Sequence, residues 1–116
     1  MKTLKLTSQL SCEQVYQIWT TEPEVIQILD LRSPVDFDRS HIPQAINITE
    51  TEASKILENL NDRLAVFICS QEEQRRLSES LYEYSNFVFM RDCERWLSLE
   101  YPMEGSLKNC SQQKKF

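Results

Sequence analysis

Cys69 is the side chain with the clearest chemical potential, because it directly follows an apolar run and stands just before a predicted helix. A thiol there faces the unpaired N–H groups and the partial positive charge of the helix N-terminus, and both favour the thiolate. The same amides can hold an oxyanion or a persulfide sulfur. Free cysteine is also common as a small buried hydrophobic side chain. Position alone therefore leaves both a reactive and an inert Cys69 open.

Two carboxylates follow this thiol closely. Glu72 and Glu73 fall in the first turn of the predicted helix, where acids complement the helix dipole. If they line a cradle around the sulfur instead, they oppose the thiolate. A unit charge at about 8 Å costs a thiolate roughly 0.5 kcal/mol in a water-like medium and about 2 kcal/mol at an effective dielectric constant of 20. The orientation of these two side chains therefore decides the reactivity of Cys69.

The elements that position these groups follow from the apolar pattern. Branched and aromatic runs predict buried strands at Val25–Leu29, Leu64–Ile68 and Phe87–Met90, with a weaker one at Ala45–Ile48. Helical patterns lie between them, at about residues 11–19, 33–42, 53–60, 71–85 and 96–102. This alternation predicts an α/β fold with a mostly parallel central sheet of four to five strands and helices on both faces.

Composition excludes several function classes. The chain has 116 residues, with 41% hydrophobic and 27% charged residues, as expected for one globular domain. Its net charge of −5 argues against nucleic-acid binding by phosphate neutralisation. No apolar run approaches the roughly 18 residues of a membrane span, and no signal peptide opens the chain. We therefore expect a cytoplasmic monomer with neither a membrane nor a nucleic-acid partner.

Cysteine and glycine usage narrow the chemistry further. The four cysteines form no CxxC motif and His41 is the only histidine, so no metal site is predicted and the thiols are expected to be reduced. Gly105 is the only glycine, which excludes glycine-rich phosphate-binding loops. We expect one domain over residues 1–104. Residues 105–116 hold three lysines and no acid, and are expected to form a basic, disordered tail.

Several segments together resemble the rhodanese-like domain signature. Ile28–Phe37 contains its D-[VL]-R strand end and acidic-Phe helix, and His41–Ile48 contains its HIPGAxN element. Cys69 falls where the family keeps its sulfur-carrying cysteine. Trp96 and Pro102 match the closing aromatic helix and the proline after it. The match spans nearly the whole chain, about residues 9–104.

The resemblance implies a sulfurtransferase without a metal or organic cofactor. Cys69 would take a sulfane sulfur from a small anion such as thiosulfate, or from a persulfide donor, and pass it to cyanide, a thiol or a partner protein. This chemistry needs a low-pKa cysteine, because only the thiolate attacks. Backbone amides of the following loop would hold the persulfide: Ser70, Gln71, Glu72, Glu73, Gln74 and Arg75. The site rim would consist of Asp30, Arg32, His41 and Arg91. At the rim we expect Arg32 to pair with Asp36 or Asp38, and His41 to hold the turn before Pro43.

The departures from the family pattern fall on this loop. Active members read C-R-x-G-x-R, whereas Ser70, Glu72 and Gln74 replace the arginine, the glycine and the second arginine. Gln44 replaces the glycine of HIPGA, and Arg91-Asp92 replaces a glycine pair before the last helix. These changes support an alternative function as a catalytically degenerate module for protein interaction or regulation.

A second alternative is an enzyme similar to cysteine phosphatases or arsenate reductases. Cys69 and Arg75 have the C-x5-R spacing of such loops, in which the planar arginine fork clamps an oxyanion. Arg75 and Arg76 also fit an exposed helix face. Cys93 aligns with an apolar position of the final helix and is expected to pack in the core.

Overall fold

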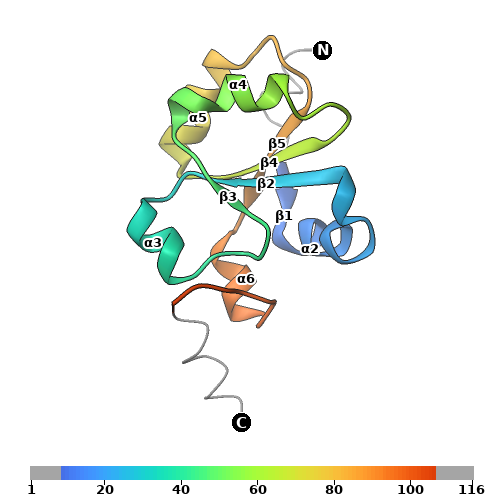
Figure 1. Ribbon diagram of the computed structural model, residues 1–116, viewed down its shortest axis with the longest axis vertical. Coiled ribbons are helices and arrows are strands. Elements are labelled where there is room, and N and C mark those ends of the chain that lie inside the picture. The colour runs from blue at the N-terminus through green and yellow to red at the C-terminus, as the bar shows by residue number, and fades with distance from the viewer. Residues whose placement is uncertain (1–8, 107–116) are drawn as a thin grey trace.

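The computed structural model describes residues 9–106, and its centre is a parallel sheet (Figure 1). Its strand order is β1-β5-β4-β2-β3, and every neighbouring pair is parallel. The strands are β1 (Gln9–Ser11), β2 (Ile26–Asp30), β3 (Ile46–Asn47), β4 (Leu64–Ile68) and β5 (Phe87–Arg91). The predicted α/β class and parallel sheet are confirmed.

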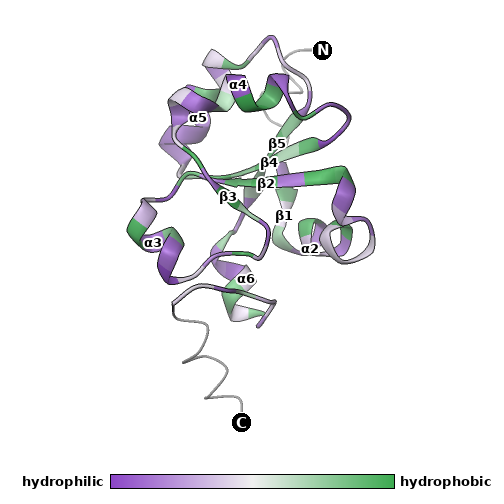
Figure 2. Cartoon of the chain, viewed as in Figure 1, coloured by the Kyte–Doolittle hydropathy of each residue, from purple (hydrophilic) through white to green (hydrophobic). Residues whose placement is uncertain are grey.

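Helices cover both faces of this sheet, as predicted. They are α2 (Cys12–Thr21), α3 (Pro34–Arg39), α4 (Ala53–Glu58), α5 (Gln71–Ser80) and α6 (Glu94–Ser98), with 3-10 turns η1 (Pro23–Val25) and η2 (Glu50–Glu52). Hydrophobic residues of α4 and α5 pack on one face, and those of α2 and α6 on the other. The strands are largely hydrophobic and the helices carry polar outer faces (Figure 2).

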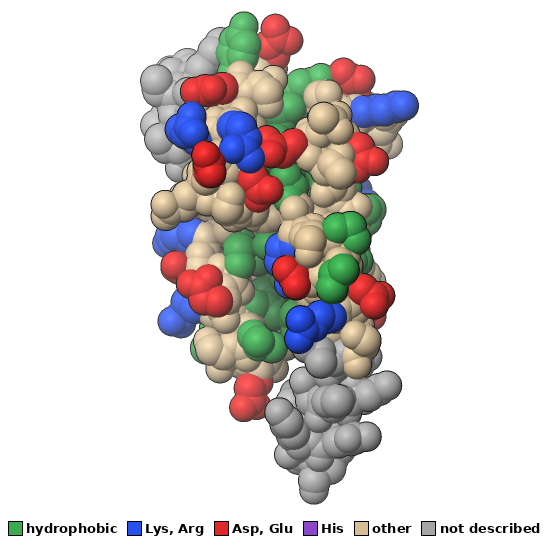
Figure 3. Space-filling model, turned by 90° about the vertical axis from the view of Figure 1, so that its left-hand side faces the viewer, with side chains coloured by type: hydrophobic (Ala, Val, Ile, Leu, Met, Phe, Trp, Pro, Cys, Tyr) green, Lys and Arg blue, Asp and Glu red, His purple; other side chains and the backbone are tan. Residues whose placement is uncertain are grey.

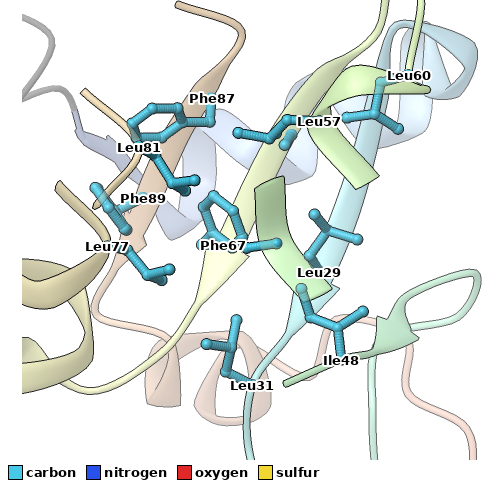
Figure 4. Close-up of a cluster of buried hydrophobic side chains, with 12 residues drawn as sticks. Leu29, Leu31, Ile48, Leu57, Leu60, Phe67, Leu77, Leu81, Phe87 and Phe89 are labelled. Carbon is cyan, nitrogen blue, oxygen red and sulfur yellow. The ribbon is translucent and has the colours of Figure 1, made fainter. Parts of the chain in front are cut away.

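Alternation along the strands divides the core into two layers. On the α4–α5 face, Phe67, Phe87 and Phe89 form a triad with ring centroids 5.6–5.8 Å apart, capped by Leu77 and Leu81 (Figure 4). The opposite layer contains Val15, Val66 and Trp96, among others. All of these side chains are buried. Burial at about 25 cal/mol per Å² makes these layers the main favourable term for folding.

The structure differs from the predicted elements mainly at their ends. The strand predicted from Val25 begins at Ile26 and runs through Asp30, because Val25 belongs to η1. The predicted fourth strand shortens to two residues, and the helices predicted to end near residues 42 and 85 end at Arg39 and Ser80. β1 was not predicted, since a three-residue strand with a single apolar side chain has no pattern to detect. It forms because β5 offers it a parallel partner.

At two positions where the rhodanese-like signature has glycine, this chain has another residue in the positive-φ backbone conformation that favours glycine. Gln44 has φ 74° and Asp92 has φ 58°, both in the left-handed region. An L-residue there is strained by roughly 1–2 kcal/mol, because its Cβ crowds the backbone.

We expect Gln44→Gly to stabilise the protein by about 0.5–1 kcal/mol, since the relief of strain exceeds the added chain entropy. Gln17→Gly in α2 is the matched control and should destabilise by about 1 kcal/mol. Urea denaturation of the three proteins measures both changes. Equal losses of stability in the two variants would show that Gln44 carries no strain.

The last described residues form a C-terminal strap, residues 101–106, that docks on the end of α3. His41 and Glu104 exchange backbone hydrogen bonds of 2.8 Å in each direction, and Ser106 N–H donates to Asp38 O at 2.9 Å. Gly105 has φ 127°, and a Cβ on it would lie 2.6 Å from Asp38 O, so only glycine fits. The predicted tail therefore begins with two docked residues, and the rest of it lies outside the described residues. Across residues 9–106, no helix has the length and apolar character of a membrane span.

Candidate functional site

The carboxyl ends of the parallel strands form one edge of the sheet; in Figure 1, β2 and β4 end at the left, and β5 ends below them, above α6. The strand order reverses between β2 and β4, since the chain leaves β2 for β3 on one side and later crosses to β4 on the other. Such a switch point is where open α/β sheets form a ligand crevice. Asp30 ends β2 and Cys69 follows β4 directly, so the topology brings the predicted site residues to this edge.

Cys69 itself is partly buried and packs against the core layer under α4 and α5. This follows from strand alternation, because Ala65, Phe67 and then Cys69 fall on the same face. Cys93 packs in the opposite layer. The two thiols that follow β4 and β5 therefore lie on opposite faces of the sheet, and both are reduced.

The segment after Cys69 is a helix start rather than an open loop. Ser70 is the N-cap of α5, its Oγ accepts from Glu73 N–H at 3.1 Å, and its own N–H donates to Glu73 Oε1 at 2.9 Å. Gln74 N–H donates to Ser70 O at 2.9 Å. The reciprocal capping box and the first helical hydrogen bond together use three amides of the six-residue segment that was expected to cradle a persulfide. Glu73 thus points its carboxylate at the helix N-terminus, as the dipole interpretation predicts.

The pKa of Cys69 is raised, whereas a thiol at a free helix N-terminus was expected to have a lowered one. Burial, followed by the negative charge of Glu73, raises the pKa of Cys69 to about 12. The expectation of a favoured thiolate assumed that the helix N-terminus was free to act on the sulfur. In the structure the Glu73 carboxylate accepts the Ser70 N–H, and its negative charge opposes the thiolate.

The two arginines of this segment do not form an oxyanion clamp. Residues 71–75, which a C-x5-R loop would wrap around its anion, are helical. Arg75 is exposed on α5 and borders a polar hollow with Gln71 and Gln74. Arg76 pairs with Glu50 of η2 at 2.8 Å and with exposed Glu72 at 3.7 Å. These contacts fit the interpretation of an exposed helix face.

Asp30 and Arg32 form the most highly constrained pair at the sheet edge. The Asp30 carboxylate is fully buried and accepts from Arg32 N, Nε and Nη2 at 2.8–3.0 Å. Arg32 Nη2 also donates to Ser40 O at 2.7 Å. The Asp30 hydrogen bonds raise the pKa of Arg32. The expected pairing of Arg32 with Asp36 or Asp38 is replaced by this bidentate pair, because a buried carboxylate needs a charged partner more than an exposed one does.

His41 fastens the strap to α3. Its Nδ1 lies 2.6 Å from Phe37 O, its Nε2 lies 3.2 Å from Glu104 Oε2, and its ring stacks on Phe37 with centroids 3.8 Å apart. Both ring nitrogens are thus occupied by structural partners. The predicted role of holding the turn before Pro43 fits this geometry. Arg91, the fourth predicted rim residue, is half-exposed and lies 3.9 Å from Asp92.

A pocket of about 340 Å³ opens at the switch point, and it is lined by Cys93 rather than by Cys69. Asp30 and Arg32 line one side of it. The other lining side chains come from the segment after α3, the ends of β4 and β5, α6 and the strap. They are mainly apolar: Ile42, Ile68, Met90, Trp96, Leu97 and Met103. Figure 3, which views the left-hand side of Figure 1, shows hydrophobic side chains interspersed with charged ones on this face.

Sequence reasoning missed most of this lining. The apolar pattern of the last strand and helix gave a signal for Met90, Trp96 and Leu97, but as core residues. Nothing in the sequence places Met103 beside β2, since the strap reaches that position through its pairing with His41. Across residues 9–106, no cluster of three or more His, Cys, Asp or Glu side chains has a metal-site arrangement.

Comparison with known proteins connects this geometry to a family. The model of the rhodanese-like domain matches residues 11–96. A comparison with curated proteins finds no match. Solved structures that share the fold include the three below, and at identities below 25% they bear on the fold alone.

The BH2092 protein of Bacillus halodurans has 17% identity and a TM-score of 0.70, over 90% of this chain and 82% of that one. A rhodanese-related protein of Thermoplasma volcanium has 23% identity and a TM-score of 0.66, over 84% and 97%. The single-domain sulfurtransferase RDL2 of Saccharomyces cerevisiae has 18% identity and a TM-score of 0.58, over 79% and 89%. With the family model matched over most of its length, the chain belongs to the rhodanese-like domain family.

Proposed function

We propose that this protein is a rhodanese-like binding module that does not turn over sulfur under physiological conditions. One observation carries the proposal: the Ser70–Glu73 capping box engages two of the backbone amides that a persulfide would need, those of Ser70 and Glu73. A sulfurtransferase cradle requires inward-facing N–H groups with an electropositive field. Here the amides of Ser70, Glu73 and Gln74 are hydrogen-bonded, and the Glu73 carboxylate lies against the N-terminus of α5.

The chemistry of the thiol supports the same proposal. Sulfur transfer begins with attack by a thiolate, whereas burial and Glu73 hold the pKa of Cys69 at about 12. Neither arginine of α5 is placed to bind an anionic sulfur donor at Cys69. Arg76 is paired with Glu50, and Arg75 lies on the exposed side of the helix. The groups that could bind a ligand lie at the switch-point pocket, where the Arg32 guanidinium is next to apolar side chains.

Sulfur transfer through Cys69 is the second candidate, and a specific observation favours it. The thiol follows β4 directly and is only partly buried, which is the position that the chemistry needs. RDL2, a similar structure, is described as a single-domain sulfurtransferase.

Incubation with thiosulfate separates the two candidates. We expect the full chain to gain no sulfur atom by intact mass and to release no thiocyanate from thiosulfate and cyanide above the level of Cys69→Ala. A known thiosulfate sulfurtransferase run in parallel serves as the positive control. Addition of one sulfur atom in the native chain but not in Cys69→Ala would overturn the module and establish the transferase.

A further inference from the structure

The switch-point pocket has the location and construction of a small-molecule site. Asp30, Ile68 and Met90 lie at the ends of three adjacent strands, α6 closes one side and the strap closes another. Its volume of about 340 Å³ lies within the usual range for ligand sites of roughly 300–1,000 Å³. The pocket is separate from the Cys69 thiol, whose side chain packs on the opposite face of the sheet.

Apolar walls require an apolar body in the ligand. Ile42, Met90 and Trp96 are buried in the core, and their edges face the pocket. Leu97 lines the pocket and is 61% exposed. An exposed leucine beside an apolar cavity contributes binding free energy when a ligand covers it, because its surface then leaves water.

Arg32 supplies a fixed polar anchor. Its Nε and Nη2 are held by Asp30 and Ser40 O, so the guanidinium has one orientation before any ligand arrives. Its side chain is 36% exposed, and Nη1 has no hydrogen-bond partner in the described part of the chain. A preorganised guanidinium edge favours a carboxylate, which accepts charge-assisted hydrogen bonds in the same plane.

The surrounding charges limit how much negative charge the ligand can carry. Asp30 already balances Arg32, and exposed Glu94 adds a negative charge to the pocket lining. A dianion such as thiosulfate or sulfate would meet net repulsion, and it has no apolar body for the walls. A monocarboxylate can pair with the guanidinium and meets less repulsion from Glu94 than a dianion does.

We propose that the switch-point pocket binds a small monocarboxylate with an apolar, ring-sized body. This rests on the proposed function as a binding module and names its ligand class. The carboxylate contacts Arg32 Nη1, and the apolar body lies against Met90, Leu97 and Met103.

Three probes with one ring and different head groups test the ligand class. Phenylacetate, benzyl alcohol and benzylamine are titrated into the full chain and followed by amide chemical shifts. We expect phenylacetate to bind about tenfold more tightly than either of the others, with its largest shifts at the lining residues. Equal affinity for benzyl alcohol, tighter binding of benzylamine, or no binding of phenylacetate would each overturn the proposal.

Variants of exposed lining residues test the location without risk to the fold. Glu94→Gln should tighten phenylacetate binding about two- to fivefold, because it removes a repulsive charge. Leu97→Asp should weaken binding about tenfold, since it adds repulsion and removes an apolar contact. Glu24→Gln, a charge removal at the opposite end of β2, should leave the affinity unchanged. Unchanged affinity in both pocket variants would contradict the assignment.

The thiosulfate assay on the same preparation keeps the two proposals distinguishable. Sulfur loading together with phenylacetate binding would overturn the module and leave the pocket site intact. Absent sulfur loading together with absent phenylacetate binding would overturn the pocket site and leave the module intact.

Discussion

Alkylation of Cys69 should be on the order of a thousandfold slower at pH 8 than alkylation of an unperturbed cysteine. The reason is the thiolate fraction, since a thiol with a pKa of about 12 is ionised only to about one part in ten thousand at that pH. Site-resolved mass mapping after iodoacetamide treatment measures the rate for Cys69 separately. The rate should rise about tenfold per pH unit from pH 7 to pH 10 without a plateau.

The two neighbouring glutamates provide a matched control for the cause. Glu73→Gln keeps a residue that can close the capping box but removes the charge that raises the pKa of Cys69, so it should speed alkylation severalfold. Glu72 is 71% exposed and is not among the groups that raise this pKa, so Glu72→Gln should leave the rate unchanged. A plateau near pH 7 in the native chain would mean that the sulfur lies in an electropositive environment after all.

Arg32→Gln should lower the free energy of unfolding by about 3–5 kcal/mol, the largest loss expected for a single polar substitution in this protein. Arg32 is the charged partner of Asp30, whose carboxylate is fully buried. Removing the guanidinium leaves an uncompensated buried charge, which is far more costly than the loss of an exposed ion pair. Urea denaturation monitored by circular dichroism measures the change.

A double-mutant cycle separates the effect of the buried charge from the effect of side-chain packing at the Asp30–Arg32 pair. Asp30→Asn combined with Arg32→Gln should be more stable than Arg32→Gln alone, because the neutral amide removes the stranded charge. Arg39→Gln removes an exposed arginine of α3 and should change stability by less than about 0.5 kcal/mol. If the double variant is no more stable than Arg32→Gln, the loss reflects packing rather than charge.

These two expected results separate what holds the fold from what the proposed loss of sulfur chemistry depends on. The Asp30–Arg32 pair supports the sheet edge itself and serves any ligand that binds there. The segment after Cys69 serves only the thiol. That segment contains no glycine, and its Ser70 and Glu73 have capping-box spacing. A regular helix is therefore more stable for it than an open cradle.

Much of the architecture was predictable because the local signals agreed. The apolar run of β4 predicted both the strand and its bounds, Leu64–Ile68. The site was less predictable. The six residues after Cys69 were assigned as a possible cradle by resemblance, although their own chemistry already favoured a helix start. The Ser70–Glu73 spacing already selects Glu73 for the capping box, whereas the burial of Cys69 beside it depended on the packing of α4 and α5.

By itself, the sequence determined the parallel α/β architecture, the two apolar layers and the edge at which Asp30, Arg32 and Cys69 meet, because periodicity and capping act over a few residues. Only the tertiary structure decided the environment of each group. It buried the Asp30 carboxylate, which therefore became the partner of Arg32. It also placed Cys69 and Cys93 on opposite faces of the sheet. The pairing of His41 with Glu104 brought Met103 to the pocket. Burial and long-range pairing set desolvation and charge proximity, and these depend on residues that are distant in the chain.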